Sequence, residues 1–165
     1  MDHLSLHDAY KNGDLEVLRA CLGYPPDFPN NSPPAGWDST CLDYAIYYSP
    51  LSFVRILLEL GADPNYEEGS YPSLLAALSS ARDDRYALLE LLLDYGADIH
   101  QRGINDYTPL HYAANLDDPR AIGILLSHGA DREARTNVDD YATPLEEAQN
   151  LGRNLAVYAL SLEHP

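Results

Sequence analysis

The sequence is poor in cysteine, and it lacks long hydrophobic runs. It has 2 cysteines, Cys21 and Cys41, which are too few for a disulfide-stabilised scaffold, so we expect two reduced thiols. No apolar run approaches the ~18 residues of a membrane span. The N-terminus also lacks the basic region and apolar stretch of a secretory signal. These absences favour a soluble, cytoplasmic protein.

Positive charge is scarce as well. Against 26 Asp and Glu residues there are 10 Lys and Arg, which gives a formal net charge of −16 over 165 residues. A surface with that charge repels phosphates and anionic lipid headgroups, so nucleic acids and membranes are disfavoured as partners. Phenylalanine is rare, with 2 residues against 13 tyrosines, but hydrophobic residues make up 45% of the chain. That share suffices for a folded core, and the length favours a single domain, 1–165.

What the sequence does contain is internal repetition. Gly-Ala-Asp occurs at residues 61–63, 96–98 and 129–131, with spacings of 35 and 33 residues, and a leucine-rich run precedes each copy. A second block lies upstream of each run and is clearest as Thr-Pro-Leu-His-Tyr-Ala at residues 108–113. Its aligned alanines are Ala9, Ala45, Ala77, Ala113 and Ala148.

These blocks resemble the ankyrin repeat, a unit of about 33 residues with a Thr-Pro-Leu-His block and two helices. The resemblance implies an all-α solenoid of helix-turn-helix units joined by short β-hairpin fingers, which share one core. The expected units are about 3–23, 38–65, 70–100, 106–133 and 141–162, the last as a C-terminal cap. A proline-rich loop, 24–37, follows the first unit, and its aromatic residues favour partial order over a mobile loop.

Helix-capping residues support this assignment. Thr108 and Thr143 can cap first helices, and the proline after each fits the first helical turn. The candidate caps of the second helices are Asp14, Ser49, Asp84 and Asp118. The glycines of the Gly-Ala-Asp blocks are expected to end the second helices at positive φ. The third unit has about three extra residues near 80–85, which should lengthen a helix or the turn.

No arrangement of residues predicts catalysis. Neither cysteine has a base at a recognisable spacing, and no His-x₃-His or Cys-x₂-Cys pattern suggests zinc. Acidic pairs at 83–84 and 117–118 fall at helix starts, where capping explains them. By resemblance His111 is structural, bonded to backbone and to the Thr108 hydroxyl. We therefore expect no enzyme activity, no cofactor and no metal site.

The ankyrin resemblance places partner binding on the finger tips and on the first helices, where a stack leaves a concave groove. Tyrosines recur at these positions, and tyrosine is enriched at interface hot spots because it offers apolar area and a hydroxyl with few rotamers. Tyr44 and Tyr112 are instead expected to pack between repeats. The predicted partner-binding residues are Trp37, Asp38, Tyr47, Tyr48, Glu67, Glu68, Tyr71, Tyr95, Asp106, Tyr107, Asn115, Asp139, Asp140 and Tyr141.

A tyrosine-lined surface with an acidic rim suits a basic protein partner, because opposite charge raises the association rate. One hypothesis is a stoichiometric inhibitor that is a monomer when free. It rests on the likeness in size and charge to ankyrin-type immunity proteins, whose partner is a toxin domain. The alternative is a scaffold or regulatory adaptor that inhibits nothing. A toxin-like gene beside this one would favour the inhibitor.

Overall fold

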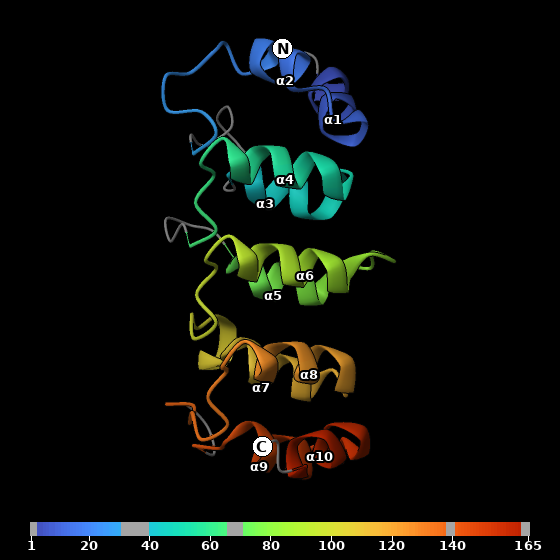
Figure 1. The fold of residues 1–165 in the computed structure, drawn as a ribbon, viewed down its shortest axis with the longest axis vertical. Coiled ribbons are helices and arrows are strands. Elements are labelled where there is room, and N and C mark those ends of the chain that lie inside the picture. Colours follow the sequence, from blue (N-terminus) through green and yellow to red (C-terminus); the bar gives the residue numbers. More distant parts are fainter. Residues whose placement is uncertain (1–2, 31–39, 66–70, 138–140, 163–165) are drawn as a thin grey trace. The chain divides into compact units, whose positions relative to one another are not determined.

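The computed structural model describes residues 3–30, 40–65, 71–137 and 141–162 (Figure 1). These ranges hold α-helices and no β-strand. Two compact units make up the chain, Met1–Ala97 and Asp98–Pro165, and each is described by itself. Within the described ranges, no helix is both long and apolar enough to cross a membrane.

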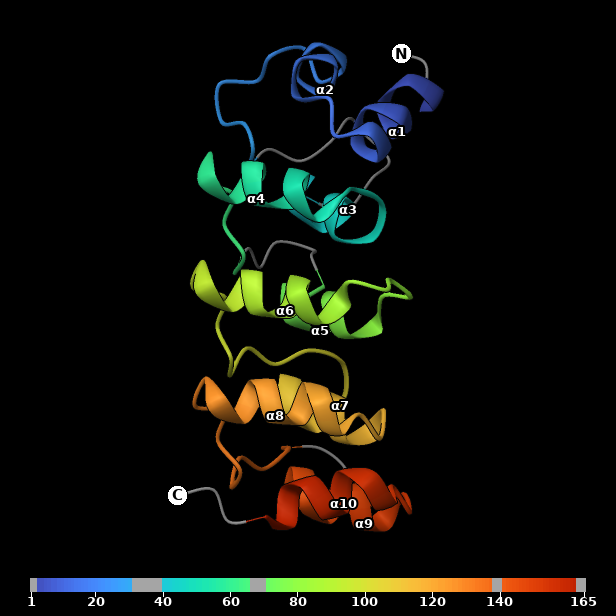
Figure 2. The ribbon, with the colours of Figure 1, turned by 45° about the vertical axis from the view of Figure 1, so that its right-hand side comes forward.

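The N-terminal unit contains three antiparallel helix pairs. They are α1 (His3–Asn12) with α2 (Leu15–Cys21), α3 (Cys41–Tyr48) with α4 (Leu51–Glu59), and α5 (Ser73–Ser79) with α6 (Arg85–Asp94). The first helices pack in a row, α1 on α3 and α3 on α5, and α4 contacts α6 (Figure 2). Small buried residues such as Ala45, Ala76 and Ala77 let the first helices approach, while Leu57 and Leu92 fill the core between the rows.

The C-terminal unit contains two further pairs. After a 3₁₀ turn, η1 (Ile104–Asp106), come α7 (Pro109–Asn115) with α8 (Pro119–Ser127), and α9 (Pro144–Asn150) with α10 (Asn154–Ser161). α7 packs on α9 and α8 packs on α10. This all-α repeat architecture confirms the solenoid expected from the sequence.

Three first helices, α3, α7 and α9, begin at threonine caps, and those at Thr108 and Thr143 were predicted. The Thr108 and Thr143 side chains accept hydrogen bonds from the backbone N–H three residues on, and Thr40 does the same at α3. Asp43 and Glu146 bond back to the cap residue, which completes two capping boxes.

Second helices follow the predicted caps in two cases out of four. Asp14 and Asp118 accept hydrogen bonds from Val17 and Ala121. The predictions of Ser49 and Asp84 as side-chain caps were wrong. α4 begins after Pro50, one residue beyond Ser49, and the Ser49 hydroxyl is buried without a hydrogen-bond partner among the described residues. The Asp84 carboxylate is bound to Arg82 at 2.7 Å instead.

The second helices α4, α6 and α8 end at glycines with positive φ, as predicted. Gly61, Gly96 and Gly129 have φ values of 92°, 84° and 89°. The extra residues of the third unit lengthen the turn between α5 and α6, not a helix. The longer turn lets the Arg82 guanidinium donate to the backbone carbonyls of Ile46 and Ser49, near the end of α3.

In their described parts, the connections between helix pairs form isolated hydrogen bonds and no β-ladder. Gly103 N–H donates to the Tyr107 carbonyl at 3.0 Å, and Thr136 N–H donates to the Ala142 carbonyl at 3.1 Å. In the proline-rich loop, Asn30 bonds the Gly61 carbonyl and the Asp63 N–H at 2.8 and 2.7 Å. This part of the loop is therefore ordered, and residues 31–37 lie outside the described residues.

Candidate functional site

The first helices of the N-terminal unit carry a group of aromatic side chains, here called the tyrosine cluster: His7 on α1 with Tyr44, Tyr47 and Tyr48 on α3. The Tyr44 and Tyr48 rings lie 4.5 Å apart between centroids, and His7 meets Tyr48 edge-on at 5.4 Å. Tyr47 lies 6.2 Å from Tyr48. Residues 44 and 48 are one helical turn apart, which places both rings on the same face of α3.

Burial divides the cluster into an inner and an outer part. Tyr10 of α1 is fully buried, and its ring packs against Tyr44 at 4.6 Å. The Tyr44 hydroxyl also lies 2.8 Å from His7 Nδ1, so this tyrosine packs between repeats, as predicted. Tyr47 and Tyr48 point outward and are 41% and 51% exposed. The inner ring of Tyr44 therefore supports the exposed ring of Tyr48, and Tyr47 lies beside Tyr48.

Tyr47 also contacts the next first helix, since its hydroxyl lies 3.3 Å from Ser79 Oγ on α5. Burial raises the pKa of Tyr44, so its phenol stays neutral at physiological pH. The cluster thus offers apolar ring faces and hydroxyl groups. Such a surface can bind apolar and hydrogen-bonding groups, and its ring faces attract cations.

The other predicted tyrosines of this unit lie apart from the cluster. Tyr71 precedes α5 and is half-buried. Tyr95 ends the second helix α6, where its hydroxyl lies 3.4 Å from a Glu59 carboxylate oxygen at the end of α4. Tyr95 therefore belongs to the second-helix row, whereas the cluster belongs to the first.

In the C-terminal unit the predicted tyrosines Tyr107 and Tyr141 lie shortly before the first helices α7 and α9. Tyr107 stacks on His111 at 5.6 Å between ring centroids and 16° between planes, and its hydroxyl donates to Glu147. Tyr141 is 57% exposed, and the Arg135 guanidinium lies 5.9 Å from its ring centroid. Asn115 is half-buried at the end of α7. Each of these two tyrosines has a charged partner, Glu147 for Tyr107 and Arg135 for Tyr141.

Two carboxylates of this unit, Asp106 and Glu146, form ion pairs with arginines. Asp106 accepts from Arg102 and from the backbone and side chain of Asn137, the last at 2.8 Å. Glu146 accepts from Arg135 at 2.8 and 3.2 Å. The backbone N–H of Thr143, followed by Arg135, holds the pKa of Glu146 below its usual range. The predicted rim residue Asp106 is thus already engaged inside the unit.

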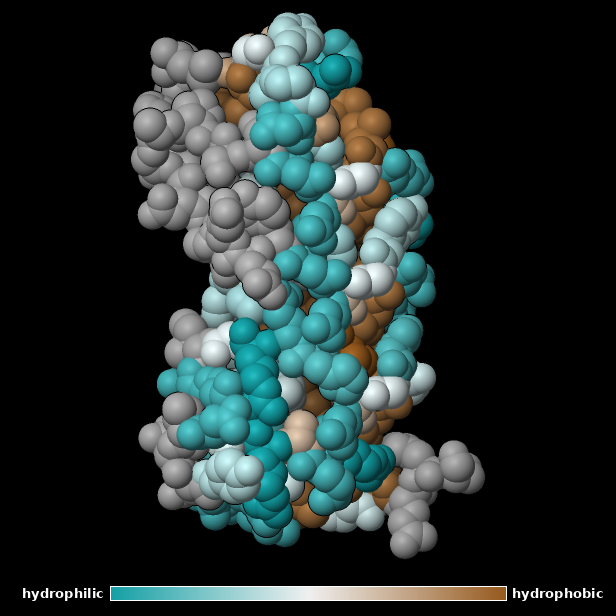
Figure 3. All heavy atoms as spheres, turned by 90° about the vertical axis from the view of Figure 1, so that its left-hand side faces the viewer, coloured by the Kyte–Doolittle hydropathy of each residue, from teal (hydrophilic) through white to brown (hydrophobic). Residues whose placement is uncertain are grey.

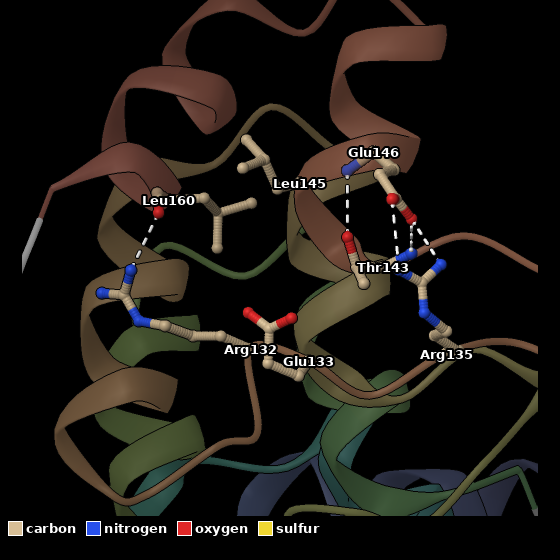
Figure 4. Close-up of a pocket in the computed structure, with 7 residues that line it drawn as sticks. All are labelled: Arg132, Glu133, Arg135, Thr143, Leu145, Glu146 and Leu160. Atoms are coloured by element: carbon tan, nitrogen blue, oxygen red, sulfur yellow. Dashed lines mark hydrogen bonds and ion pairs between the residues drawn. The ribbon is translucent and has the colours of Figure 1, made fainter.

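The side of the molecule with the interrepeat connections carries many hydrophilic side chains within each unit (Figure 3). The C-terminal unit has a cavity of about 220 Å³ that the sequence did not predict (Figure 4). Residues of the connection before α9, of α9 itself and of α10 line it. Arg132 donates to the Leu160 carbonyl at 2.8 Å on one side of it, and the Arg135–Glu146 pair closes the other. Two arginines and two glutamates line the cavity, so its formal charges balance.

The remaining candidates add no chemistry within the described residues. No group of His, Cys, Asp and Glu there could hold a metal ion. Burial raises the pKa of the Cys41 thiol to about 11, so it is protonated and a poor nucleophile near neutral pH. Predicted residues outside the described ranges are Trp37, Asp38, Glu67, Glu68, Asp139 and Asp140.

Sequence reasoning missed His7 and Arg82. His7 falls 37 residues before Tyr44, close to one repeat period, so aligned first helices place the two side chains on neighbouring helices. Comparing registers between units could have found it. Arg82 lies in the inserted turn, and no repeat position corresponds to it.

Family comparisons agree with the helix pairs. A family model described as ankyrin repeats (3 copies) matches residues 74–164, and another described as ankyrin repeat matches residues 37–69. The two matches together cover most of the chain.

Individual relatives are similar over parts of their length. A putative ankyrin repeat protein, FPV031, of fowlpox virus is 36% identical over 99 residues, 59% of this chain and 28% of the viral protein. Protein phosphatase 1 regulatory subunit 27 of Mus musculus is 42% identical over 76 residues, 46% of this chain and 49% of that protein. Alpha-latrocrustotoxin-Lt1a of Latrodectus tredecimguttatus is 30% identical over 149 residues, 90% of this chain and 10% of the toxin. The chain thus spans about half or less of each relative.

Proposed function

The chain belongs to the ankyrin repeat family, whose repeats form protein–protein interaction modules, and on that premise we propose that it binds a protein partner through the tyrosine cluster. The exposure of Tyr47 and Tyr48 is the observation that carries the proposal. The Tyr48 ring packs against Tyr44 and His7, and Tyr47 lies beside Tyr48 with its hydroxyl near Ser79, so little side-chain entropy is lost when a partner covers them.

We propose further that the partner is basic. A chain of net charge −16 attracts positive surfaces over long range, which speeds association and disfavours acidic competitors. At short range an arginine or lysine of the partner can lie over the exposed ring of Tyr48, a contact worth ~0.5–2 kcal/mol. Binding should therefore weaken as salt is added.

Two roles fit such binding. The first is a stoichiometric inhibitor, such as an immunity protein against a toxin, which is a monomer when free. The second is a regulatory adaptor, which is favoured by the similarity to a protein named as a regulatory subunit of protein phosphatase 1. Measuring the partner's own activity at saturation separates them, because an inhibitor abolishes it and an adaptor leaves it.

The test begins with a photo-crosslinking amino acid in place of Tyr47 in the native host, followed by mass spectrometry of the adduct. The matched control carries the same group in place of Tyr24, which is 57% exposed on the connection after α2. We expect an adduct from position 47 only. Crosslinks from position 24 alone would remove the tyrosine cluster as the binding surface.

The purified partner then allows affinity measurements by calorimetry. Replacing Tyr47 and Tyr48 together by alanine should weaken binding at least about 100-fold, which corresponds to two hot-spot side chains of moderate strength. Tyr24→Ala should leave the affinity unchanged. An affinity that does not change between low and physiological salt would refute the basic partner while leaving the tyrosine surface in place.

A further inference from the structure

The hydrogen bonds around Tyr47 decide in which direction its hydroxyl can act. The hydroxyl oxygen of Tyr47, on α3, lies 3.3 Å from Ser79 Oγ on α5. A serine hydroxyl has a single hydrogen, and Ser79 donates its hydrogen to the Ala76 carbonyl, one turn earlier in α5, at 3.1 Å. The Ser79 oxygen is therefore left as an acceptor, and Tyr47 is the donor in the contact between the two helices.

With its own hydrogen used in this way, the Tyr47 hydroxyl can only accept further hydrogen bonds. A phenol oxygen retains lone-pair capacity after donating. Tyr47 is 41% exposed and its contact with Ser79 is open to solvent, so this oxygen is within reach of a binding partner. A polar partner group that bonds to it must therefore be a donor, an N–H or an O–H.

The neighbouring ring of Tyr48 supplies a different kind of contact. Its centroid lies 6.2 Å from that of Tyr47, with 49° between the ring planes, and the residue is 51% exposed. Packing against Tyr44 and His7 holds this ring in position. The face of a tyrosine ring attracts cations. Tyr47 and Tyr48 thus place an acceptor oxygen beside a cation-attracting ring.

The charged groups near the tyrosine cluster do not exclude a cation. Asp8 and Lys11 follow His7 on α1, and both are exposed, so their formal charges offset each other. Arg82 lies near the end of α3, where its charge is paired with Asp84 at 2.7 Å. The net charge of −16 then favours a cationic donor over a neutral one.

Of the two basic side chains, arginine meets both requirements at once. Its guanidinium is planar and its N–H bonds lie in that plane, so a guanidinium stacked on the Tyr48 ring directs donors sideways, towards the Tyr47 oxygen. A lysine ammonium is a compact, strongly hydrated point charge with no plane to stack on the ring. Lysine can make either contact, but it lacks the geometry that combines them.

We propose that the tyrosine cluster selects an arginine side chain of the partner, whose guanidinium stacks on Tyr48 and donates to the Tyr47 hydroxyl. Ser79 is the positioning residue, because it takes up the Tyr47 hydrogen and leaves an acceptor facing the partner. The inference rests on the proposed function and deepens it by naming the chemical group that is recognised.

Three capped tripeptides test the inference on the full chain: acetyl-Gly-Arg-Gly-amide and its counterparts with lysine or glutamate in the middle. NMR titrations at low salt follow the ring signals of Tyr47 and Tyr48. The arginine peptide should bind in the millimolar range, roughly threefold or more tighter than the lysine peptide, and the glutamate peptide should not bind. An arginine peptide that binds no better than the lysine peptide, or not at all, would overturn the inference.

Variants assign the preference to the two hydroxyls. Tyr47→Phe keeps the ring and removes the acceptor, so it should abolish the preference for arginine over lysine. Ser79→Ala should reduce the preference when Tyr47 is present and should add nothing to Tyr47→Phe, as expected of a residue that acts through the Tyr47 hydroxyl, and Ser79→Thr should retain it. Tyr24→Phe removes a hydroxyl from an exposed tyrosine outside the cluster and is the matched control, with no expected change. An arginine preference that survives Tyr47→Phe would refute the assigned hydrogen bond.

This inference and the proposed function fail separately. Crosslinks from position 47 without any preference for the arginine peptide would remove arginine as the recognised group and leave the tyrosine cluster as the binding surface. Selective binding of the arginine peptide without crosslinks from position 47 would remove the protein partner and leave the recognition of arginine. Amide spectra recorded in the same titrations confirm that each variant is folded.

Discussion

At the scale of single residues, support from neighbours separates the tyrosines that can act in binding from those that hold the fold. Tyr10 is buried and Tyr44 is half-buried against it, so both stabilise the contact of α1 with α3. Tyr47 and Tyr48 extend the same group of rings into solvent. A single helix, α3, therefore carries structural and exposed rings one turn apart.

Tyr47→Ala should spare folding and harm binding. Its ring is 41% exposed, and the contact of its hydroxyl with Ser79 is exposed to solvent, so the free energy of unfolding should change by less than ~1 kcal/mol. The free energy of binding to the partner should become less favourable by about 2 kcal/mol. Urea denaturation and calorimetry measure the two quantities. A large loss of stability with intact binding would assign Tyr47 to the core.

His111 should make stability depend on pH. It is fully buried, with Nδ1 2.8 Å from Thr108 Oγ1 and Nε2 3.1 Å from the Ala142 carbonyl, which requires the proton on Nε2. Burial is the main cause that lowers its pKa below the usual 6.5. Between the lowered pKa and about 6.5, His111 therefore binds a proton in the unfolded chain but not in the folded chain. Stability should fall as the pH drops from about 6.5 towards the lowered pKa, and not further from this cause.

Urea denaturation of the wild type and of His111→Asn between about pH 7.5 and 5 isolates this effect, because the other histidines are common to both proteins. The variant should be less stable at neutral pH and should lose less stability on acidification. Equal pH dependence in both proteins would show that His111 is not responsible.

At the scale of elements, the inserted turn between α5 and α6 joins two repeats. Arg82, whose side chain is 12% exposed, donates to carbonyls near the end of α3 and to Asp84. The hydrogen bond from Arg82 lowers the pKa of Asp84, so the pair is ionised. The insertion thus satisfies carbonyls that the end of a helix leaves unpaired.

Arg82→Ala should destabilise the protein by ~1–3 kcal/mol, since it leaves buried carbonyls without a donor. Arg82→Lys should recover only part of this, because an ammonium cannot bind the carboxylate and the carbonyls in the same planar arrangement. Arg55→Ala, on the exposed side of α4, is the control with no expected effect. If urea denaturation gives the same free energy of unfolding for Arg82→Ala and Arg55→Ala, Arg82 does not stabilise the contact between the two repeats.

The core of each helix pair is the other feature at this scale. Leu125 of α8 is fully buried, and Leu125→Ala should cost ~2–5 kcal/mol, with the cavity adding to the lost burial. Leu116→Ala removes the same atoms from a side chain that is 42% exposed and should cost much less. The measurement is again urea denaturation, and equal costs would place Leu125 outside the core.

At the scale of the whole molecule, net charge opposes folding. A charge of −16 over 165 residues repels itself, and four ion pairs between described residues offset it locally: Arg19–Glu16, Arg82–Asp84, Arg102–Asp106 and Arg135–Glu146. The exposed pairs Arg19–Glu16 and Arg135–Glu146 contribute ~0–1 kcal/mol each, and the two less exposed pairs are too few to offset the net charge. Repulsion should therefore dominate the response to salt.

Added salt should raise the melting temperature, because screening weakens the repulsion more than it weakens a few pairs. Calorimetric melts from low to physiological ionic strength at neutral pH measure this. A falling melting temperature would mean that the local ion pairs outweigh the net charge.

Much of the fold could be predicted from the sequence, but less of the site. Thr108, Thr143 and Asp118 act as caps because a cap depends on backbone groups three residues away. Ser49 failed as a cap because Pro50 moves the helix start by one residue. For Asp106 the sequence indicated an acidic position, but its partners Arg102 and Asn137 are set by the folded connection.

The sequence by itself determined the repeat register and the helix ends, since both follow from local patterns: periodic leucines, capping side chains, and glycines that tolerate positive φ. Only the tertiary structure decided which tyrosines of α3 face solvent and which carboxylates are already paired. The exposure of these side chains depends on helices about a repeat apart in the sequence, which meet only when the helix pairs stack. The pairing of the carboxylates depends on how each connection folds, since Asp106 and Glu146 meet arginines that precede them in the same connection.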